Sequence, residues 1–346
     1  MSVLVLYNLI KLQMGNVNYK DYRSGGIPMD VRQLLENLTQ WQPPVVGEDI
    51  PHGDMPGDKV EIGEVHIQKA NVIFPKLLEE LKKVFVENHT NKAVVAVCGG
   101  SGVGKSETAS LLSYYFKCMG IGSYTLSGDN YPRRIPMYND AERLHIFRES
   151  GLRAMIEAGT YSEERYSIIK EFQINEDDAN KAHITDHPWM ASYIDGGVEG
   201  LKGYLGTAHE IEFDQMTKIV KSFKAGEEKI WLKRMGRTNT ELWYEAVDFS
   251  DIQVLVIEWT HGNSDYYEGV DIPVLLNSTP QETLEHRRSR NRDGKIDSPF
   301  TMRVLEIEQG MLMNQAHKAK IILSKRGELL SFADYEQLMA AQKIEM

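Results

Sequence analysis

The chain has little cysteine and no surplus of basic residues, and each of these features excludes some classes of protein. Only Cys98 and Cys118 occur among 346 residues, too few for a disulfide framework or for a zinc site built on cysteines. Lys and Arg total 39 against 50 Asp and Glu, a net charge of −11. Because binding of phosphate backbones needs clustered Lys and Arg, a dominant nucleic-acid binder is excluded, and any anion must be bound locally.

Long apolar runs are missing as well. The stretch from Val3 to Ile10 is too short to span a bilayer and no basic residue precedes it, so it predicts neither a transmembrane helix nor a secretory signal. Together with the cysteine usage, this predicts a cytoplasmic protein with no membrane partner. The 42% hydrophobic and 26% charged residues are typical of a globular chain.

Residues 1–90 are expected to form an N-terminal accessory extension. Prolines and glycines punctuate 41–60, which predicts an extended loop. Apolar residues recur with helical spacing on both sides of this loop: Val31, Leu34, Leu35 and Leu38 before it, and Ile73, Leu77, Leu78, Leu81 and Val84 after it. Both helices are expected to pack on a core that follows.

From residue 93 onward, short apolar runs alternate with helical segments. The runs are 93–97, 123–126, 252–257, 272–276 and 320–323. Such runs suit strands buried on both faces, so 91–330 is predicted to be an α/β domain whose mostly parallel sheet is flanked by helices. The gap from 126 to 252 is too long for one crossover. It predicts a helical insertion at 151–245, and a C-terminal helix is expected at 331–346.

Three helices are predicted within the gap from 126 to 252, near 140–158, 161–181 and 213–225. The segment 183–210 is rich in glycine and aromatic residues and is expected to be a loop. His183 and His187 have the i, i+4 spacing of metal ligands on a helix, but Pro188 interrupts the pattern and no carboxylate supports it.

The strongest motif is G-x-x-x-x-G-K-[ST] at residues 99–106. The glycines let backbone N–H groups cradle phosphate oxygens, Lys105 adds a point charge, and the Ser106 hydroxyl suits Mg²⁺. A strand-like run precedes the motif and a helical segment follows it, which is the context that a phosphate-binding loop needs. The predicted nucleotide-binding residues are Gly99, Gly100, Ser101, Gly102, Val103, Gly104, Lys105, Ser106 and Glu107.

Two carboxylates follow predicted strands. Asp129 lies in the segment Leu126-Ser127-Gly128-Asp129-Asn130-Tyr131, and Glu258 directly follows an apolar run. Transfer of a phosphoryl group to a hydroxyl requires a metal and a carboxylate that accepts the proton. Asp129, on a strand expected beside the loop strand, is therefore predicted to be the general base and a magnesium contact, unless it is an ordinary turn aspartate. Glu258 is predicted to hold Mg²⁺ with Ser106, the alternative being a structural ion pair.

These motifs resemble the phosphoribulokinase and uridine kinase branch of phosphate-loop kinases. The resemblance rests on the loop, on Ser127-x-Asp129 with nearby Tyr131, and on Glu258 closing the third strand, and it covers about 93–130 and 210–325. It implies the P-loop NTPase fold and an ATP-dependent kinase, with Mg²⁺, that transfers the γ-phosphoryl group to a hydroxyl of a small metabolite.

An arginine-rich segment follows the fourth predicted strand. Thr279 and Glu282 form a capping box with Pro280 at the first helical position. Four arginines come next: Arg287, Arg288, Arg290 and Arg292. In the resembled branch an arginine-rich lid occupies this place, which assigns Arg288 and Arg292 to the nucleotide and Arg288 also to catalysis. The alternative is a solvated basic face.

The acceptor, which the insertion at 151–245 is predicted to bind, is expected to contact two basic groups, one shortly after Asp129 and one within the insertion. The predicted contacts are Tyr131, Arg133, Arg134, Lys233, Arg234, Arg237 and His261, which favour a sugar, a sugar phosphate or another anionic polyol. The resembled branch usually has Pro-x-Tyr-Asp where this chain has Leu232-Lys233-Arg234-Met235, and this difference puts a nucleoside acceptor in doubt.

Other functions remain open at this level. A nucleotide-dependent switch or regulatory ATPase that binds a protein partner would use the same loop, and so would a sulfate-activating or nucleotide-monophosphate kinase. Guanine specificity is disfavoured because Asn-Lys-x-Asp is absent near a late strand. The sequence leaves the oligomeric state open, a homo-oligomer included.

Overall fold

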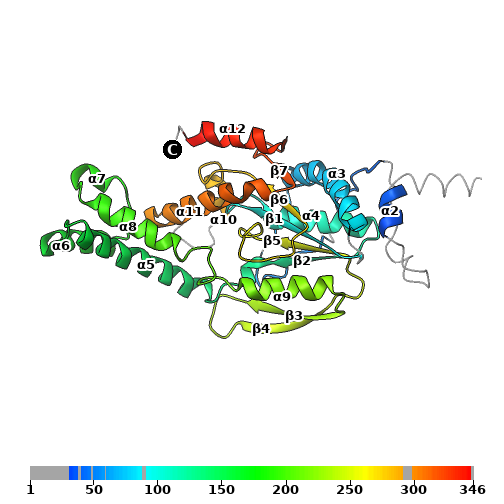
Figure 1. Cartoon of the computed structure of the whole chain (residues 1–346), viewed down its shortest axis with the longest axis horizontal. Coiled ribbons are helices and arrows are strands. Elements are labelled where there is room, and N and C mark those ends of the chain that lie inside the picture. Colours follow the sequence, from blue (N-terminus) through cyan, green and yellow to red (C-terminus); the bar gives the residue numbers. More distant parts are fainter. Residues whose placement is uncertain are drawn as a thin grey trace, which may run out of the picture.

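A six-stranded sheet forms the centre of the protein (Figure 1). The computed structural model describes residues 31–37, 40–47, 50–58, 60–87, 91–290 and 298–343. The strand order is β2-β5-β1-β6-β7-β8, and every neighbouring pair is parallel except β7 and β8. The strands are β1 (Ala93–Gly99), β2 (Ser123–Ser127), β5 (Val254–Glu258), β6 (Ile272–Leu276), β7 (Ile321–Leu323) and β8 (Leu329–Leu330). The predicted α/β class with a mostly parallel sheet is confirmed.

The neighbour of the loop strand differs from the prediction. β5 lies between β1 and β2, so the strand that carries Asp129 is one position farther from the loop. Glu258 at the end of β5 is in register with Val97 of β1 and with Ser127 of β2. Because parallel strands end at the same edge, this register places Glu258 between the two loops that follow β1 and β2.

Helices cover both faces of the sheet because its strands are apolar on both sides. Val95 and Val97 of β1 pack with α3 (Glu64–Glu87) and α4 (Lys105–Cys118). Val94 and Ala96 of the same strand point into a second core, which contains α9 (Phe213–Lys224). Figure 1 shows α3 and α4 on one side of the sheet and α9 on the other.

The N-terminal extension packs on the first of these cores. α2 (Val31–Asn37) buries Leu35, and α3 buries Phe74, whose ring contacts those of Tyr115 and Phe116. The apolar stretch from Val3 to Ile10, and Leu38 of the first predicted helix, lie outside the described residues. None of the helices in the described part of the chain is long and apolar enough to cross a membrane.

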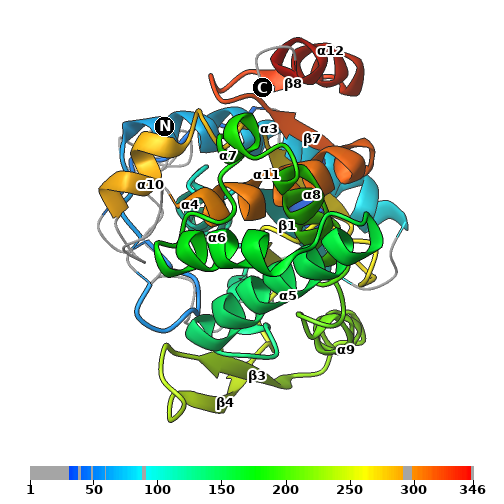
Figure 2. The same ribbon diagram turned by 90° about the vertical axis from the view of Figure 1, so that its left-hand side faces the viewer.

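A helical lobe projects from one end of the sheet (Figures 1 and 2). It comprises α5 (Pro136–Glu157), α6 (Glu163–Ile174), α7 (His183–Asp186) and α8 (Met190–Lys202). The predicted loop at 183–210 is wrong, because α7 and α8 occupy most of it. The glycines of α8 make space: a Cβ added to Gly196 would lie 2.1 Å from Ala154 Cβ, and one on Gly200 would lie 2.0 Å from Ser150 Oγ. They permit close packing of α8 on α5, and they do not form turns.

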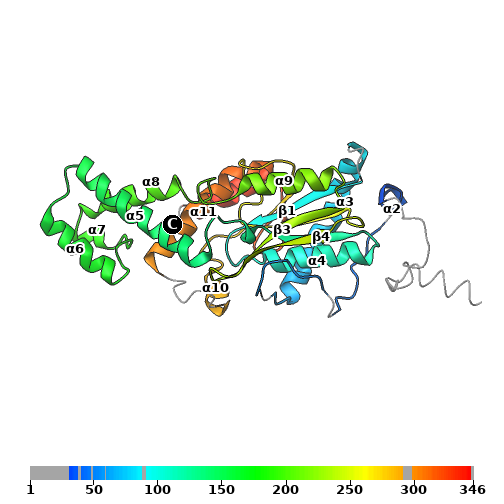
Figure 3. The same ribbon diagram turned by 90° about the horizontal axis from the view of Figure 1, so that it is seen from below.

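A β-hairpin that the sequence analysis did not predict follows α9. It consists of β3 (Lys229–Met235) and β4 (Leu242–Asp248), which pair in antiparallel orientation. Figure 3 shows the hairpin in front of the sheet, between α9 and α4. The insertion between β2 and β5 is therefore both helical and β. The chain ends with α10 (Leu284–Arg290), α11 (Pro299–Gln315) and α12 (Phe332–Lys343), the last at the predicted C-terminal helix.

Candidate active site

The loop between β1 and α4 has the backbone shape of a phosphate cradle. Gly102 and Gly104 have φ angles of 77° and 93°, a left-handed conformation that glycine adopts without a Cβ clash. Gly104 caps α4, so the N-terminus of that helix points toward the cradle. Lys105 Nζ donates to the Gly100 carbonyl at 3.1 Å, which holds the ammonium over the loop. This local positive field can bind phosphate on an acidic protein.

Glu258 connects the phosphate loop with the end of β2. Its Oε2 accepts a hydrogen bond from Ser106 Oγ at 3.1 Å, and its Oε1 accepts one from Ser127 Oγ. Burial, together with the neighbouring carboxylate of Asp129, raises the pKa of Glu258 to about 8. Without a cation the carboxyl is therefore largely protonated at pH 7, and a cation bound beside it would favour the ionised form.

The oxygens at this edge fit Mg²⁺. A serine hydroxyl and a carboxylate oxygen are hard ligands, and Mg²⁺ in such sites takes one or two protein oxygens and completes its octahedron with phosphate and water. The described residues contain no group of three His, Cys, Asp or Glu side chains arranged for a metal. Ser106 and Glu258 would therefore hold the ion together with the nucleotide, where it would neutralise charge on the phosphates.

Asp129 lies at the same edge, in the short 3₁₀ turn Gly128–Asn130. Its side chain is exposed to solvent. Its charge also raises the pKa of Glu308 on α11, although burial is the main cause of that shift and Lys105 opposes it. Asp129 and Lys105 are therefore both near enough to Glu308 for their charges to affect it.

The structure adds a residue that sequence analysis did not identify, Asp54 of the N-terminal extension. Its carboxylate accepts hydrogen bonds from Ser127 N at 2.7 Å, from Tyr124 Oη at 3.0 Å and from Asn130 Nδ2 at 3.1 Å. It also pairs with Arg234 at 2.8 Å. Its position within a Pro- and Gly-rich loop gave no signal for this role.

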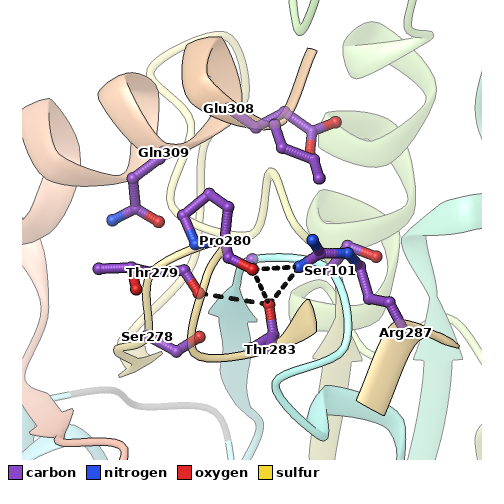
Figure 4. Close-up of a pocket in the computed structure, with 10 residues that line it drawn as sticks. Ser101, Ser278, Thr279, Pro280, Thr283, Arg287, Glu308 and Gln309 are labelled. Carbon is purple, nitrogen blue, oxygen red and sulfur yellow. Dashed lines mark hydrogen bonds between the residues drawn. The ribbon is translucent and has the colours of Figure 1, made fainter. Parts of the chain in front are cut away.

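A pocket opens beside the phosphate loop (Figure 4). Arg287 lies over the loop, since a Cβ on Gly102 would be 2.9 Å from Arg287 Cγ. The guanidinium donates to the Pro280 carbonyl at 2.7 Å and to Thr283 Oγ1. Ser101, Thr279 and Glu308 are also in the lining, which joins the loop to α11.

The arginines are arranged differently from the prediction. Arg287, to which no role was assigned, is 7% exposed and faces the loop, whereas Arg288, which was predicted to contact the nucleotide, is exposed on α10. Adjacent residues on a helix point about 100° apart, so only one of the two can face the loop. Arg292 lies outside the described residues. The predicted capping box is confirmed: Thr279 N donates to Glu282 Oε2 at 2.7 Å and Glu282 N donates to Thr279 Oγ1 at 3.3 Å.

The two basic residues of β3 are buried and paired with carboxylates. Lys233 is 4% exposed and pairs with Glu212 at 2.7 Å. Arg234 is also 4% exposed, between Asp54 and Glu245. Both cations are already compensated inside the fold, so their predicted contact with an anionic substrate lacks structural support.

The remaining predicted acceptor residues are scattered. Arg133 is exposed and lies 3.9 Å from Asp214, while Arg134 lies 3.4 Å from Glu142. Arg237 is exposed on the β3–β4 turn. Two others are buried among aromatic and apolar residues: Tyr131 is 1% exposed, and burial lowers the pKa of His261 to about 4, which keeps it neutral.

A buried polar network links α5 to Glu210, which lies between α8 and α9. Glu210 is 1% exposed and accepts from Arg143 Nε at 2.6 Å and from Asn139 Nδ2 at 2.8 Å. Burial alone would lower the pKa of Arg143, but Glu210 and Glu308 outweigh burial and raise it. These hydrogen bonds join α5 to the segment between α8 and α9, and Glu308 of α11 places a second negative charge near Arg143. Glu210 is separated from Asn139 and Arg143 by 71 and 67 residues, so no local pattern in the sequence predicts this pairing.

Comparisons with known proteins agree with a kinase-like loop. The chain is 38% identical over 262 residues, or 76% of its length, to a bifunctional α-galactosidase/sucrose kinase from Mediterraneibacter gnavus. The chain spans 23% of the length of that relative. No family model matches.

Two solved structures are also similar. One is a "putative fructose transport system kinase" from Silicibacter sp. TM1040, at 13% identity and a TM-score of 0.40, covering 72% of this chain and 92% of that one. The other is a "possible uridine kinase" from Bacillus stearothermophilus, at 15% identity and a TM-score of 0.35, covering 72% and 98%.

Proposed function

We propose that the protein is an ATP-dependent kinase that transfers the γ-phosphoryl group to a hydroxyl of a small neutral sugar. The observation that carries this proposal is one edge of the sheet, where the phosphate loop, the Ser106–Glu258 pair and the exposed Asp129 meet. Phosphoryl transfer depends on positioning and charge neutralisation, with a carboxylate near the attacking hydroxyl. This edge supplies each of these groups.

Each residue has a role that follows from its chemistry. Lys105 and the loop amides bind the phosphates, and Ser106 and Glu258 would hold Mg²⁺. Asp129 accepts the proton of the sugar hydroxyl, because it is an exposed carboxylate at the same edge. Arg287 neutralises phosphate charge from the side of the pocket.

The compensated charges favour a neutral acceptor over the sugar phosphate or anionic polyol that the sequence suggested. Arg133, Arg134, Lys233 and Arg234 each have a carboxylate within 3.9, 3.4, 2.7 and 2.8 Å. An anionic substrate that used one of these four side chains would compete with its carboxylate partner. Separation of a buried pair such as Arg234 with Asp54 costs about 3–5 kcal/mol.

A sugar acceptor also agrees with the relative from Mediterraneibacter gnavus, which has two activities in its name. Hydrolysis of a galactoside needs no nucleotide, whereas a phosphate loop is built for one. The part of that relative that matches this chain is therefore inferred to be its kinase part. Sucrose is the first acceptor to test.

The experiment measures ADP release by the purified full chain with ATP, Mg²⁺ and a panel of acceptors, and identifies the product by mass. The panel contains sucrose, fructose, glucose, galactose, their phosphates and uridine. A neutral sugar is expected to increase ADP release well above the rate without acceptor. Stimulation by sugar phosphates alone would refute the neutral acceptor, and no stimulation by any compound would refute the kinase and favour a regulatory ATPase.

Asp129→Asn tests the base in the same assay. It is expected to lower kcat by about 10²–10⁴-fold and to leave ATP binding unchanged, since Asp129 is not part of the phosphate loop. Asp251→Asn is the matched control, because Asp251 is exposed beside the opposite end of β5. A wild-type rate for Asp129→Asn with the true acceptor would contradict the assignment.

A further inference from the structure

The N-terminal extension passes across the edge of the sheet where the candidate active site lies. A Cβ added to Gly53 would be 3.8 Å from Glu258 Oε1 and 3.8 Å from Thr125 Cγ2, so this backbone is against the ends of β5 and β2. Asp54 follows directly, with a side chain that is only 8% exposed. The extension therefore brings a buried carboxylate to the active-site edge.

One oxygen of Asp54 holds both sides of the Asp129 turn. Oδ1 accepts from Ser127 N at 2.7 Å and from Asn130 Nδ2 at 3.1 Å. These two donors flank Gly128 and Asp129 in the chain. Since both ends of this two-residue arc are bonded to the same atom, the arc cannot rotate without breaking a charge-assisted hydrogen bond.

The other oxygen of Asp54 is anchored to the β-hairpin. Oδ2 accepts from Arg234 Nη1 at 2.8 Å and from Tyr124 Oη at 3.0 Å. Asn130 is fixed from the same side, because its Oδ1 accepts from Met235 N at 3.0 Å. The turn that carries Asp129 is thus held between the extension and β3.

We propose that Asp54 is a positioning residue for phosphoryl transfer: through Ser127 and Asn130 it fixes the turn that carries Asp129. The N-terminal extension then completes the active site in addition to packing on the sheet. This inference rests on the proposed function. The base must lie within hydrogen-bond reach of the acceptor hydroxyl, and misplacement by about 1 Å can cost on the order of 10²-fold in rate.

A purely structural role makes a different prediction. If Asp54 served only to compensate Arg234, its removal would lower stability and leave the kcat of the folded protein unchanged. A positioning role lowers kcat while the KM for ATP stays constant, because the phosphate loop has no bond to Asp54. The two roles are separated by this split between kcat and KM.

The experiment compares Asp54→Asn with the control Glu245→Gln in the full chain. Glu245 is the other carboxylate on Arg234, at 3.1 Å and 59% exposed, and it lies on β4, away from the Asp129 turn. Asp54→Asn is expected to lower kcat for sugar-dependent ADP release by about 10–100-fold, with the KM for ATP within twofold of wild type. Glu245→Gln is expected to remain within twofold in both. A kcat for Asp54→Asn within twofold of wild type would overturn the proposal.

Hydrogen exchange at the Ser127 amide gives a second readout that does not require activity. Asp54→Asn is expected to increase exchange in the peptide 123–131 at least tenfold, and Glu245→Gln is expected to leave it unchanged. Unchanged exchange in Asp54→Asn would overturn the proposal. If the wild type shows no sugar-dependent turnover, the proposed function fails, and this exchange measurement alone decides whether Asp54 holds the turn.

Asn130→Ala keeps the test decisive if Asp54→Asn does not fold. This change removes one donor to Asp54 and leaves the Arg234 ion pair in place. It is expected to lower kcat about tenfold at constant KM for ATP, because the turn loses one of its two hydrogen bonds to Asp54 Oδ1. An unchanged kcat in Asn130→Ala would overturn the proposal.

Discussion

Lys69 offers a measurable link between the N-terminal extension and the phosphate loop. It lies on α3, is 4% exposed, and donates from Nζ to the Val103 carbonyl at 2.9 Å. Burial, together with the charge of Lys325, lowers the pKa of Lys69 from 10.5 to about 8. Lys69→Met keeps the length of the side chain and removes the buried charge.

The magnitude and its sign follow from this pKa. A shift from 10.5 to about 8 corresponds to ~3.4 kcal/mol at 1.36 kcal/mol per pH unit. Between pH 8 and 10.5 the folded protein binds fewer protons at Lys69 than the unfolded chain, so the stability of the wild type rises with pH across this window. Lys69→Met lacks this rise. The free energy of unfolding of the variant relative to wild type should therefore fall by about 2.5 kcal/mol from pH 7 to pH 10.

Urea denaturation of both proteins at pH 7 and pH 10 measures this difference. Changes in packing are the same at both pH values and cancel in the comparison. At pH 7 the variant is expected to be as stable as wild type or more stable, since relief of ~3.4 kcal/mol exceeds the ~1.5–3 kcal/mol of one charged hydrogen bond. Lys83→Met on the same helix is the control, because the Lys83 side chain is 63% exposed. A difference that stays constant between the two pH values, or that grows, would refute the reasoning.

Three further predictions concern the site. Ser106→Ala should weaken ATP binding about tenfold in the presence of Mg²⁺ and leave ATP binding without metal unchanged. Calorimetry with and without Mg²⁺ measures both affinities. An equal loss of affinity under the two conditions would contradict the prediction. Arg287→Met should weaken ATP binding about tenfold. Arg288→Met is the comparison, which measures whether the exposed neighbour contributes. Equal binding by Arg287→Met and wild type would count against a contact with phosphate. Gly128→Ala should lower the free energy of unfolding by at least ~2 kcal/mol, because its Cβ would lie 2.0 Å from Trp259 Cγ; an unchanged Tm would contradict this.

Patterns within a few consecutive residues predicted the phosphate loop and several strands and helices. The phosphate loop is eight consecutive residues between a strand and a helix, so the motif and its context are read together. The runs 93–97 and 272–276 are apolar because those strands are buried on both faces, and both became strands of the sheet. The helix predicted at 213–225 agrees with α9 because one face of it is apolar.

Side-chain roles were predicted less well where a partner lies far away in the chain. Lys233 and Arg234 have the composition of an anion site, but Glu212 and Asp54 compensate them across 21 and 180 residues. The glycines of α8 have the composition of a loop, yet they serve the contact with α5. In each case the residue type is compatible with two roles, and only its neighbour in space selects one.

The sequence alone determined the α/β class, the phosphate loop and the carboxylates that end two strands, because these depend on backbone conformation and on burial patterns that repeat over a few residues. Only the tertiary structure decided the strand order that places Glu258 between Ser106 and Ser127, the arginine that faces the loop, and the return of Asp54 to the Asp129 turn. These depend on hydrogen bonds and ion pairs between distant segments. Such bonds form only once burial in the shared core has brought the segments together.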